Sequence, residues 1–414
     1  MSSSTGTPRG LHNEVVDAGT GTTTTWDALP TVRYPDPAVV LVDSSFEALP
    51  FVVAHSRTDG ELLIVAGSRM EPALSAELIE AGFTIVHGGD RLEPPAQARR
   101  GGEPDRLWLL TSGSTGRPKR IGHTLETLTT VTTDQAPRRW LCPYSPGTYA
   151  WWQLVTLGLA LPGQDLVVVD PADVEHWVEA GVTHEVSAAS GTPTFWRQTI
   201  MQSGDRLRDV PLAQVTLGGE PVDQSIIDQL VELFPTARVS WIYASSELGA
   251  SIVVHDGEAG FPIAWLDNPA PDRPSLSVDG DELVIASPHH GKGLGGPVRT
   301  GDRVVVEDGR VLITGRLDSD EINVGGAKVS AGQVRDVLQS HPDVAWASVR
   351  GRKAPMVGSM VVAQVVAATG ADDAASLPVR LTQWCRERLP EYGVPRMIRV
   401  RDEIPTKETL KSDV

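Results

Sequence analysis

A ten-residue stretch, Thr111 to Arg120, gathers hydroxyls, glycines and cations in one place. It reads TSGSTGRPKR and directly follows the apolar run Leu107 to Leu110, which predicts a buried strand. Glycine lets the backbone turn tightly and bring its N–H groups close to an anion, and Lys119 can reach the charge. The stretch therefore predicts a loop that wraps the phosphates of a nucleotide. A cluster of Gly, Ser and Thr also occurs as an ordinary linker, so this motif alone leaves both interpretations open.

The spacing of the glycines excludes one kind of phosphate loop. A Walker loop has four residues between its glycines and a lysine directly after the second one. Here two residues separate Gly113 from Gly116, and Lys119 follows three positions later. The string TSGSTGRPK instead resembles the phosphate-binding loop of the adenylate-forming superfamily, the group of acyl-CoA synthetases, carrier-protein adenylation domains and luciferases. The resemblance implies that the loop binds phosphates through Thr111, Ser112, Gly113, Ser114, Thr115, Gly116 and Lys119.

Further segments resemble the same family and follow in the family's order. The segment LGGEPVD resembles the one that lies against adenine, which implies binding by Gly218, Gly219, Glu220 and Pro221. Glycines there permit close approach of backbone to a flat ring. The segment YASSE resembles the family's Tyr-Gly-x-Thr-Glu, which implies that Tyr243 stacks on adenine and that Glu247 ligates Mg²⁺. The same segment supplies Ala244, Ser245 and Ser246. A hard Mg²⁺ ion needs only one or two protein oxygens, and Glu247 with the Thr115 hydroxyl is sufficient.

Two motifs nearer the C-terminus extend the resemblance. RTGDRV matches the family's Thr-Gly-Asp, so Asp302 is expected to accept hydrogen bonds from the ribose hydroxyls. GRLDSDEINVGG resembles the hinge motif. There Arg316 is expected to face the ribose or phosphates and Asp318 to be the pivot. Gly325 and Gly326 are expected in the loop that lines a tunnel for the thiol in a second conformation.

The last motif concerns one lysine. The family ends with a proline followed six residues later by an essential lysine, usually preceded by glycine. In this chain Pro405 leads to Lys411, and Leu410 stands in place of that glycine. Lys407 is the competing assignment, and a terminal lysine can also be merely solvated.

The resemblance implies one reaction. A carboxylic acid, or another oxyanion, reacts with ATP and Mg²⁺ to give an adenylate and pyrophosphate, and a thiol then displaces AMP. The expected catalytic residues are Lys411, Glu247, Lys119 and Arg316. CoA is the leading acceptor, which makes the chain an acid-thiol ligase. The alternatives are a free-standing enzyme that loads the phosphopantetheine of a carrier protein, an amide synthetase and a nitrite-activating diazotase. A regulatory nucleotide-binding module without catalysis is disfavoured because the charged residues are retained.

The acid substrate is the least determined part. The segment LCPYSPGTYAWWQL occupies the place of an aromatic or histidine gate, yet it contains no histidine. Flat side chains there would suit an aromatic acid, and the candidate wall consists of Tyr149, Trp151, Trp152, Trp196 and Trp241. Aromatic residues at helical spacing are also common in cores, so that interpretation stays open.

The elements that must position these residues follow an α/β pattern. From about residue 26, short apolar runs such as VVLVD alternate with helical stretches such as EPALSAELIEAG, which predicts parallel strands covered by helices. Residues 262–315 change to short strands with Asp-Gly turns, a β-rich subdomain. We expect a disordered segment over 1–25 and an adenylation domain over 26–317. A small mobile α+β lid domain is expected over 318–414.

Composition bounds the remaining possibilities. The chain has 414 residues, enough for two or more domains, and a formal charge of −17. Such a charge disfavours binding to nucleic acid or to an anionic membrane. No signal peptide or long apolar run is recognisable, so a cytoplasmic location is expected. The two cysteines, Cys142 and Cys385, have no metal-binding spacing and are expected to be buried thiols.

Overall fold

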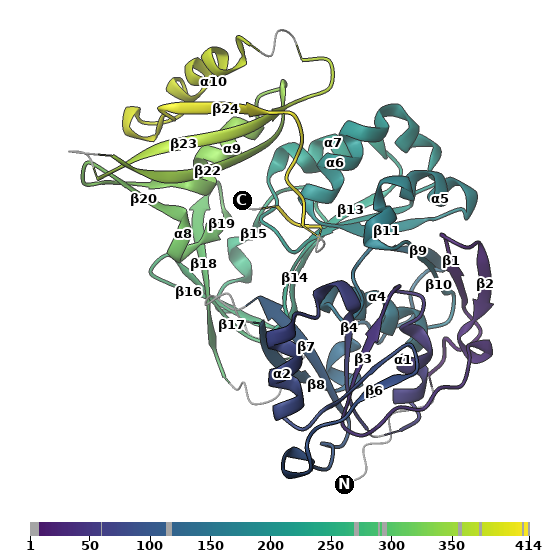
Figure 1. Ribbon diagram of the computed structural model, residues 1–414. Helices are drawn as coiled ribbons and strands as arrows, with labels where there is room; N and C mark the ends of the chain where they lie inside the picture. Colours follow the sequence, from purple (N-terminus) through teal and green to yellow (C-terminus); the bar gives the residue numbers. More distant parts are fainter. Residues whose placement is uncertain are drawn as a thin grey trace.

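The computed structural model describes residues 8–58, 60–112, 118–268, 273–288, 290–291, 296–354, 358–371, 375–407 and 410–412. Figure 1 shows a large N-terminal part of stacked sheets and helices and a smaller C-terminal part above it. In the described residues, no helix combines the length and the apolar character that crossing a membrane requires. The α/β fold class predicted from the sequence is confirmed.

The first layer is a six-stranded sheet of order β6-β5-β3-β4-β7-β8. Its inner strands are parallel and its edge strands β6 and β8 antiparallel. The strands are β3 (Ala38–Val42), β4 (Glu61–Ala66), β5 (Thr84–His87), β6 (Asp90–Leu92), β7 (Arg106–Ser112) and β8 (Pro118–His123). Helix α1 (Leu49–His55) packs on one face and α2 (Pro72–Glu80) on the other. The central strands are apolar runs because both of their faces are covered.

The second layer is an eight-stranded sheet of order β14-β13-β12-β11-β9-β10-β1-β2. Its strands are β1 (Glu14–Asp17), β2 (Thr22–Thr25), β9 (Arg138–Cys142), β10 (Gln164–Val168), β11 (Ala188–Gly191), β12 (Gln214–Gly218), β13 (Arg238–Ser245) and β14 (Gly249–Val254). The intervening helices are α3 (Leu125–Leu128), α4 (Tyr149–Ala160), α5 (Trp177–Thr183), α6 (Pro193–Ser203) and α7 (Gln224–Leu233). All the strands except β2 and β14 run parallel to their neighbours.

The start of the chain differs from the expectation of disorder over residues 1–25. Strands β1 and β2 lie there, and both belong to the eight-stranded sheet. Val15 and Val16 are buried because they pair with the apolar β10, whereas the polar threonines of β2 form the sheet edge. Only two consecutive residues of β1 are apolar, and so short an apolar run among polar neighbours does not predict a strand.

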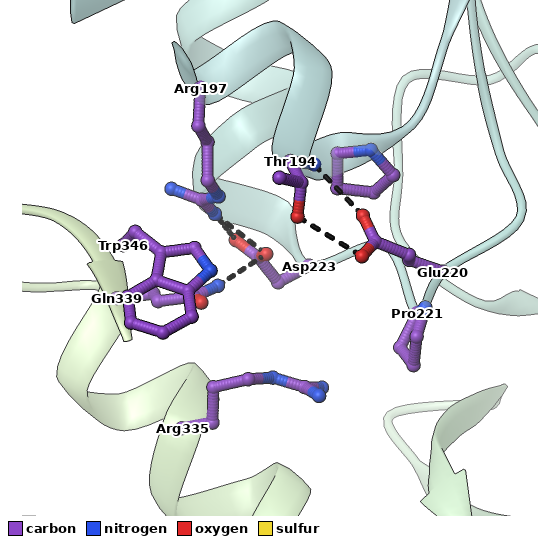
Figure 2. Close-up of a pocket in the computed structure, with 9 residues that line it drawn as sticks. Thr194, Arg197, Glu220, Pro221, Asp223, Arg335, Gln339 and Trp346 are labelled. Carbon is purple, nitrogen blue, oxygen red and sulfur yellow. Dashed lines mark hydrogen bonds and ion pairs between the residues drawn. The ribbon is translucent and has the colours of Figure 1, made fainter. Parts of the chain in front are cut away.

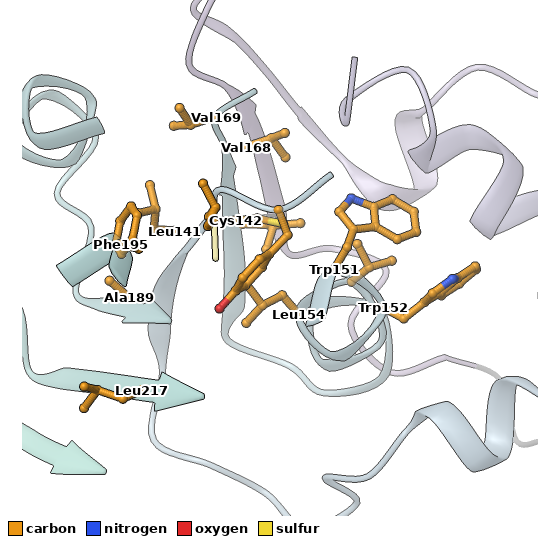
Figure 3. Close-up of a cluster of buried hydrophobic side chains, with 14 of the residues drawn as sticks. Leu141, Cys142, Trp151, Trp152, Leu154, Val168, Val169, Ala189, Phe195 and Leu217 are labelled. Carbon is orange, nitrogen blue, oxygen red and sulfur yellow. The ribbon is translucent and has the colours of Figure 1, made fainter. Parts of the chain in front are cut away.

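Both sheets share one hydrophobic cluster, to which β3, β4, β7 and β9 to β13 contribute together with α1 and α4. Figure 3 shows part of this cluster, with Leu141 and Cys142 of β9 beside side chains of α4. Cys142 and Cys385 are both buried free thiols, as predicted. Burial raises the pKa of Cys142 to about 12, so this thiol is inert at neutral pH.

Hydroxyl and carboxylate side chains fix where several helices begin. Thr148, Thr192, Asp223 and Ser330 each accept a backbone N–H in the first turn, of α4, α6, α7 and α9 (Ala331–Gln339) respectively. Such caps satisfy donors that have no partner within the helix. Short 3₁₀ turns complete the connections: η1 (Trp26–Ala28), η2 (Gly67–Arg69), η3 (Ala96–Ala98), η4 (Pro171–His176), η5 (Gly204–Asp209), η6 (Ile263–Trp265) and η7 (Glu391–Gly393).

The β-rich subdomain is a five-stranded sheet of order β15-β19-β18-β17-β16. Its strands are β15 (Phe261–Pro262), β16 (Ser275–Asp279), β17 (Glu282–Ala286), β18 (Val298–Glu307) and β19 (Arg310–Arg316). The predicted Asp-Gly hairpin is present between β18 and β19, where Asp308 and Gly309 both have positive φ. Two such residues in succession suit the twist of a two-residue hairpin turn.

The C-terminal part has its own sheet and its own core. Its strands are β20 (Glu321–Val324), β21 (Ala327–Ser330), β22 (Val344–Ala354), β23 (Gly358–Ala367) and β24 (Met397–Arg401). They are ordered β21-β20-β23-β22, and β24 pairs in parallel with β23. Helices α9 and α10 (Leu377–Arg386) cover one face, and α8 (Leu317–Asp320) precedes β20. After β24 the chain runs back to the large domain (Figure 1).

Gly147 lies where the six-stranded and eight-stranded layers approach each other closely. It lies just before α4 with φ of 77°, and a Cβ there would lie 1.9 Å from the backbone oxygen of Ile64 in β4. We expect Gly147→Ala to lower the free energy of unfolding by roughly 1–3 kcal/mol in urea denaturation. The control is Gly101→Ala, an exposed position with no atom within 4 Å of the added carbon. Equal effects of both variants would contradict the close approach.

Candidate active site

Three neighbouring parallel strands, β11, β12 and β13, deliver candidate residues to one edge of the eight-stranded sheet. Gly191 at the end of β11 pairs with Leu217, and Gly218 at the end of β12 pairs with Ile242. Thr192 and Gly219 follow these strand ends directly, and Tyr243 is the next residue of β13 after Ile242. Ligands of open α/β sheets bind beyond the carboxyl ends of the strands, so this edge is where a site is expected.

Tyr243, Asp302 and Arg316 form a connected group although they are far apart in sequence. The Tyr243 hydroxyl donates to Asp302 Oδ2 at 2.5 Å, and Arg316 Nη1 donates to Asp302 Oδ1 at 3.1 Å. Asp302 and Arg316 are also direct neighbours in the β18–β19 ladder. Burial, together with the charge of Asp302, raises the pKa of Tyr243, so the phenol stays protonated and holds the carboxylate in place.

Ser246 and Glu247 lie in the turn that follows β13. Ala244 and Ser245 pair with β14, and Ser245 Oγ accepts the N–H of Leu248, which closes the turn. His123 at the end of β8 contacts the backbone oxygen of Ser246 through Nε2 at 2.7 Å. Burial lowers the pKa of His123, so the ring is neutral and Nε2 is the donor in this contact. His123 thus ties the six-stranded sheet to the turn that carries Glu247.

Glu247 fits the role of a magnesium ligand. Its backbone oxygen accepts the N–H of Gly291, and within the described ranges its carboxylate has no hydrogen bond or ion pair. No group of three or more His, Cys, Asp or Glu residues suited to a metal exists among the described residues. One hard oxygen donor with no competing partner suits Mg²⁺, which keeps several waters and substrate phosphates as its other ligands.

Lys411 returns to the site from the other end of the chain. Its Cε lies 3.0 Å from the point where a Cβ on Gly219 would sit, and Gly219 has φ of 83°. The next residue, Ser412, donates its N–H to Glu220 Oε1 at 2.8 Å. Lys407, the competing assignment, is exposed like Lys411, and its N–H donates to the backbone oxygen of Lys411, but only Lys411 is among the atoms nearest to Gly219. The geometry favours Lys411 over Lys407.

The surroundings of Lys411 affect its charge. Part of the residue is exposed, but protein atoms crowd the side chain near Gly219. This desolvation lowers the pKa of Lys411 from its ordinary value of 10.5, and the charge of Glu220 acts in the opposite direction. The ammonium group is therefore more easily deprotonated than that of a solvated lysine.

The predicted phosphate loop stands between β7 and β8 in the sequence. Thr111 pairs with Lys119 in this antiparallel ladder, Ser112 ends β7, and Lys119 is exposed. Gly113, Ser114, Thr115 and Gly116 lie outside the described residues, so their predicted roles, including the magnesium role of Thr115, stay predictions.

The predicted hinge and tunnel residues are exposed and follow β19 in the chain. Asp318 is exposed in α8, directly after β19. Gly325 and Gly326 form the exposed turn between β20 and β21, with φ of 59° and 91°. Their contact with a thiol stays a prediction.

The aromatic residues predicted to line an acid pocket lie mostly in the core. Trp151, Trp152 and Trp196 are fully buried, and Trp241 is 6% exposed. The first two meet edge to face on α4 within the cluster of Figure 3. Trp196 and Trp241 donate their indole N–H groups to the backbone oxygens of Thr216 and Glu258. The structure therefore supports the core alternative for these four tryptophans.

Tyr149 differs from the tryptophans, since it is only half-buried and its ring centre lies 6.4 Å from that of His123. Because His123 contacts the Ser246 turn, Tyr149 lies on the side of α4 that faces the site. A contact between Tyr149 and the acid stays a prediction.

A pocket between the large domain and the C-terminal part adjoins Glu220 and Pro221. Figure 2 shows it lined by Thr194 and Arg197 of α6 and by Arg335 and Gln339 of α9. Arg197 donates to both oxygens of Asp223 at 2.8 and 2.7 Å, and Gln339 donates to the same carboxylate at 2.8 Å. This buried set of hydrogen bonds holds the C-terminal part against α6 and α7.

Sequence reasoning missed several residues that shape the site: His123, Thr192, Thr194, Trp346 and Ser412. Thr192 and Thr194 lie directly after β11 and at the start of α6, at positions to which the sequence motifs assigned no role. His123, Trp346 and Ser412 carry no local signal, because each contacts the site through a partner that is distant in sequence.

Comparisons with known proteins agree with this geometry. The family model of AMP-binding enzymes matches residues 93–315, and the model of the AMP-binding enzyme C-terminal domain matches residues 333–411. The chain belongs to the AMP-binding enzyme family, within the adenylate-forming superfamily, as the sequence predicted.

Relatives of known name include ligases and a peptide synthetase. The chain is 28% identical to 4-chlorobenzoate–CoA ligase from Arthrobacter sp, over 82% of this chain and 70% of that protein. It is 26% identical to surfactin synthase subunit 1 from Bacillus subtilis (strain 168), over 91% of this chain. The chain spans only 12% of the length of that subunit.

Solved structures share the fold at low identity. The anthranilate CoA ligase AuaEII, in complex with anthranoyl-AMP, superposes with a TM-score of 0.72 at 16% identity. The match covers 98% of this chain and 93% of the AuaEII chain. The amide bond synthetase McbA from Marinactinospora thermotolerans superposes with a TM-score of 0.69 at 21% identity. The match covers 98% of this chain and 96% of the McbA chain.

The environment of Lys411 predicts a pH dependence. Because the lowered pKa makes deprotonation easier, the kcat/KM for ATP should fall as pH rises, with an apparent pKa below 10.5. Lys411→Arg should remove this decline, because a guanidinium stays charged in that range. Pyrophosphate release measured across the alkaline range checks the prediction. An unchanged decline in the arginine variant would assign it to another group.

Proposed function

We propose that this chain is an acid-thiol ligase that forms an acyl-adenylate from a carboxylic acid and ATP and then transfers the acyl group to CoA. The observation that carries the proposal is the position of Lys411. It reaches Gly219 at the edge of the eight-stranded sheet where Tyr243 also lies, and Asp302 and Arg316 are hydrogen-bonded there. In a chain of net charge −17, cations gathered at one sheet edge favour a polyanionic substrate.

In the first step a carboxylate oxygen attacks the α-phosphorus of ATP. A new carbon–oxygen–phosphorus link forms, the bond between the α- and β-phosphates breaks, and pyrophosphate leaves. Lys411 and Arg316 stabilise the charge that spreads over the phosphoryl oxygens, and Lys119 extends this role toward the leaving group. Tyr243 and Asp302 hold the nucleoside, the phenol against adenine and the carboxylate against the ribose. Glu247 would hold Mg²⁺, which when bound supplies further positive charge to the phosphates.

In the second step the thiolate of CoA attacks the acyl carbon and AMP leaves. Lys411 has no role in this step, so it is free to depart with the C-terminal part. Asp318 is proposed as the pivot because it lies between the last strand of the large domain and the first strand of the C-terminal sheet. Gly325 and Gly326 would then approach the site, and their lack of side chains would leave room for pantetheine.

The acid is proposed to be aromatic. Two proteins similar to this chain are named for aromatic acids, 4-chlorobenzoate and anthranilate. Tyr149 beside His123 offers a flat surface next to the Ser246 turn. An aromatic ring packs well against such a surface.

The experiment that tests the function is AMP release with panels of benzoate-type acids, aliphatic acids and nitrite. Each acid is assayed alone and with CoA, a phosphopantetheinylated carrier protein or an amine. We expect release with a benzoate-type acid that CoA accelerates and that yields an acyl-CoA. If only the carrier protein or only an amine accelerates AMP release, that molecule and not CoA is the acceptor. Activity only with nitrite would show that the proposal of a carboxylic acid substrate is wrong.

Lys411 and Lys407 form a matched pair of variants. Lys411→Ala should lower the rate of acyl-AMP formation roughly 100- to 1000-fold, since one charge that stabilises the transition state is lost. The same variant should convert preformed acyl-AMP and CoA to thioester at nearly the wild-type rate. Lys407→Ala is the control and should retain both half-reactions. Pyrophosphate exchange and thioester formation measure the two steps, and normal exchange in Lys411→Ala would show that the assignment is wrong.

A further inference from the structure

The two neighbours of Lys411 are held by the large domain. The tail that follows β24 leaves the C-terminal part and passes down to the strand ends of the eight-stranded sheet (Figure 1). There Leu410 and Ser412, which we call the tail anchor, flank the lysine. Each of them makes contacts that the sequence resemblance does not account for.

Leu410 supplies an apolar contact. It is 2% exposed and belongs to the hydrophobic cluster of the large domain, although it lies at the end of a tail from another domain. Its φ is 59°, a backbone conformation that a leucine rarely adopts. The family motif that this segment resembles has glycine here, and Leu410 combines the backbone conformation that favours glycine with a buried side chain.

The backbone of Leu410 is also fixed. Thr192 Oγ1 accepts the N–H of Phe195 at 3.0 Å as the cap of α6, and it donates to the backbone oxygen of Leu410. The N–H of Leu410 donates to the oxygen of Lys407 at 2.8 Å. One hydroxyl therefore joins the start of α6 to the residue before the lysine.

Ser412 completes a group of hydrogen bonds with Thr194 and Glu220. Thr194 Oγ1 donates to Glu220 Oε1 at 3.0 Å, and the Ser412 hydroxyl lies 2.8 Å from Thr194 Oγ1 and 3.5 Å from Glu220 Oε1. Ser412 Oγ accepts the indole N–H of Trp346 at 3.1 Å, and the Ser412 N–H donates to Glu220 at 2.8 Å. Trp346 belongs to β22 of the C-terminal part, so Ser412 bonds to both parts of the protein.

We propose that Leu410 and Ser412 are positioning residues that hold Lys411 in the adenylate-forming arrangement, with Leu410 as the apolar anchor that this chain has in place of a glycine. The inference rests on the proposed function. A flexible tail would place its lysine in the site for only a fraction of the time, and a buried side chain with paired backbone groups raises that fraction. The anchor therefore favours the first half-reaction and must be released before the second.

The decisive variant is Leu410→Gly, which keeps the positive φ without strain and removes the apolar side chain. We expect the single-turnover rate of acyl-AMP formation to fall roughly 10- to 100-fold, with the KM for ATP nearly unchanged. Thioester formation from preformed acyl-AMP should be unchanged or faster. Leu410→Met, which keeps an apolar side chain of similar volume, should restore most of the first rate.

The structural control is Leu381→Ala, which removes a fully buried leucine from the separate core of the C-terminal part. This variant should lower thermal stability without a selective loss of acyl-AMP formation. If Leu410→Gly lowers both half-reactions in parallel, as a merely structural change would, or leaves the first one unchanged, the proposal is wrong.

A second readout does not depend on activity. Amide hydrogen exchange of the peptide that includes Leu410 to Ser412 should be slow in the wild-type protein, because the N–H groups of both anchor residues are hydrogen-bonded. Leu410→Gly should exchange faster there, with no change at β12. Equal exchange rates of this peptide in the wild-type protein and in Leu410→Gly would show that the proposed tail anchor is wrong. If the wild-type protein adenylates no acid, the proposed function fails, and the exchange result alone decides whether the anchor exists.

Discussion

The carboxylate of Glu220 is the interaction on which the site depends. It follows the strand end of β12, accepts both the N–H and the hydroxyl of Thr194 at the start of α6, and accepts the N–H of Ser412 from the C-terminal tail. Three segments distant in sequence therefore meet at one pair of oxygens. An acceptor with several lone pairs can serve all of them at once, which a neutral side chain could not do.

The two cations of the site, Arg316 and Lys411, are each positioned by neighbouring groups. Tyr243 fixes Asp302, and Asp302 in turn bonds to Arg316, so these neighbours orient the arginine although 62% of its side chain is exposed. Lys411 approaches the same sheet edge from the tail, where partial desolvation makes its charge more effective than that of a solvated lysine. A protein with net charge −17 thus places two cations at an edge where the family's substrate is a polyanion.

The motifs around Gly218 and Tyr243 are recognisable in the sequence because each is a continuous segment that includes part of a strand. Gly218 ends β12 and Tyr243 lies in the neighbouring β13, so the fold brings both motifs to the same edge of the sheet. The tryptophans of α4 and α6 show the opposite case. Helical spacing of aromatic residues suits a core and a pocket equally, and only burial shows that Trp151, Trp152 and Trp196 belong to the core. The strands β1 and β2 were missed because polar residues dominate that segment.

The sequence by itself determined the family, the α/β class and the residue types of the site, since these depend on local order and on spacing along the chain. Only the tertiary structure decided which lysine reaches Gly219 and that Leu410 is buried in the large domain. It also brought Ser412 to Glu220 across 192 positions of sequence. The physical reason is that a tail of a few residues has no periodicity of its own. Its place is fixed by hydrogen bonds and an apolar contact to groups that the fold assembles from elsewhere.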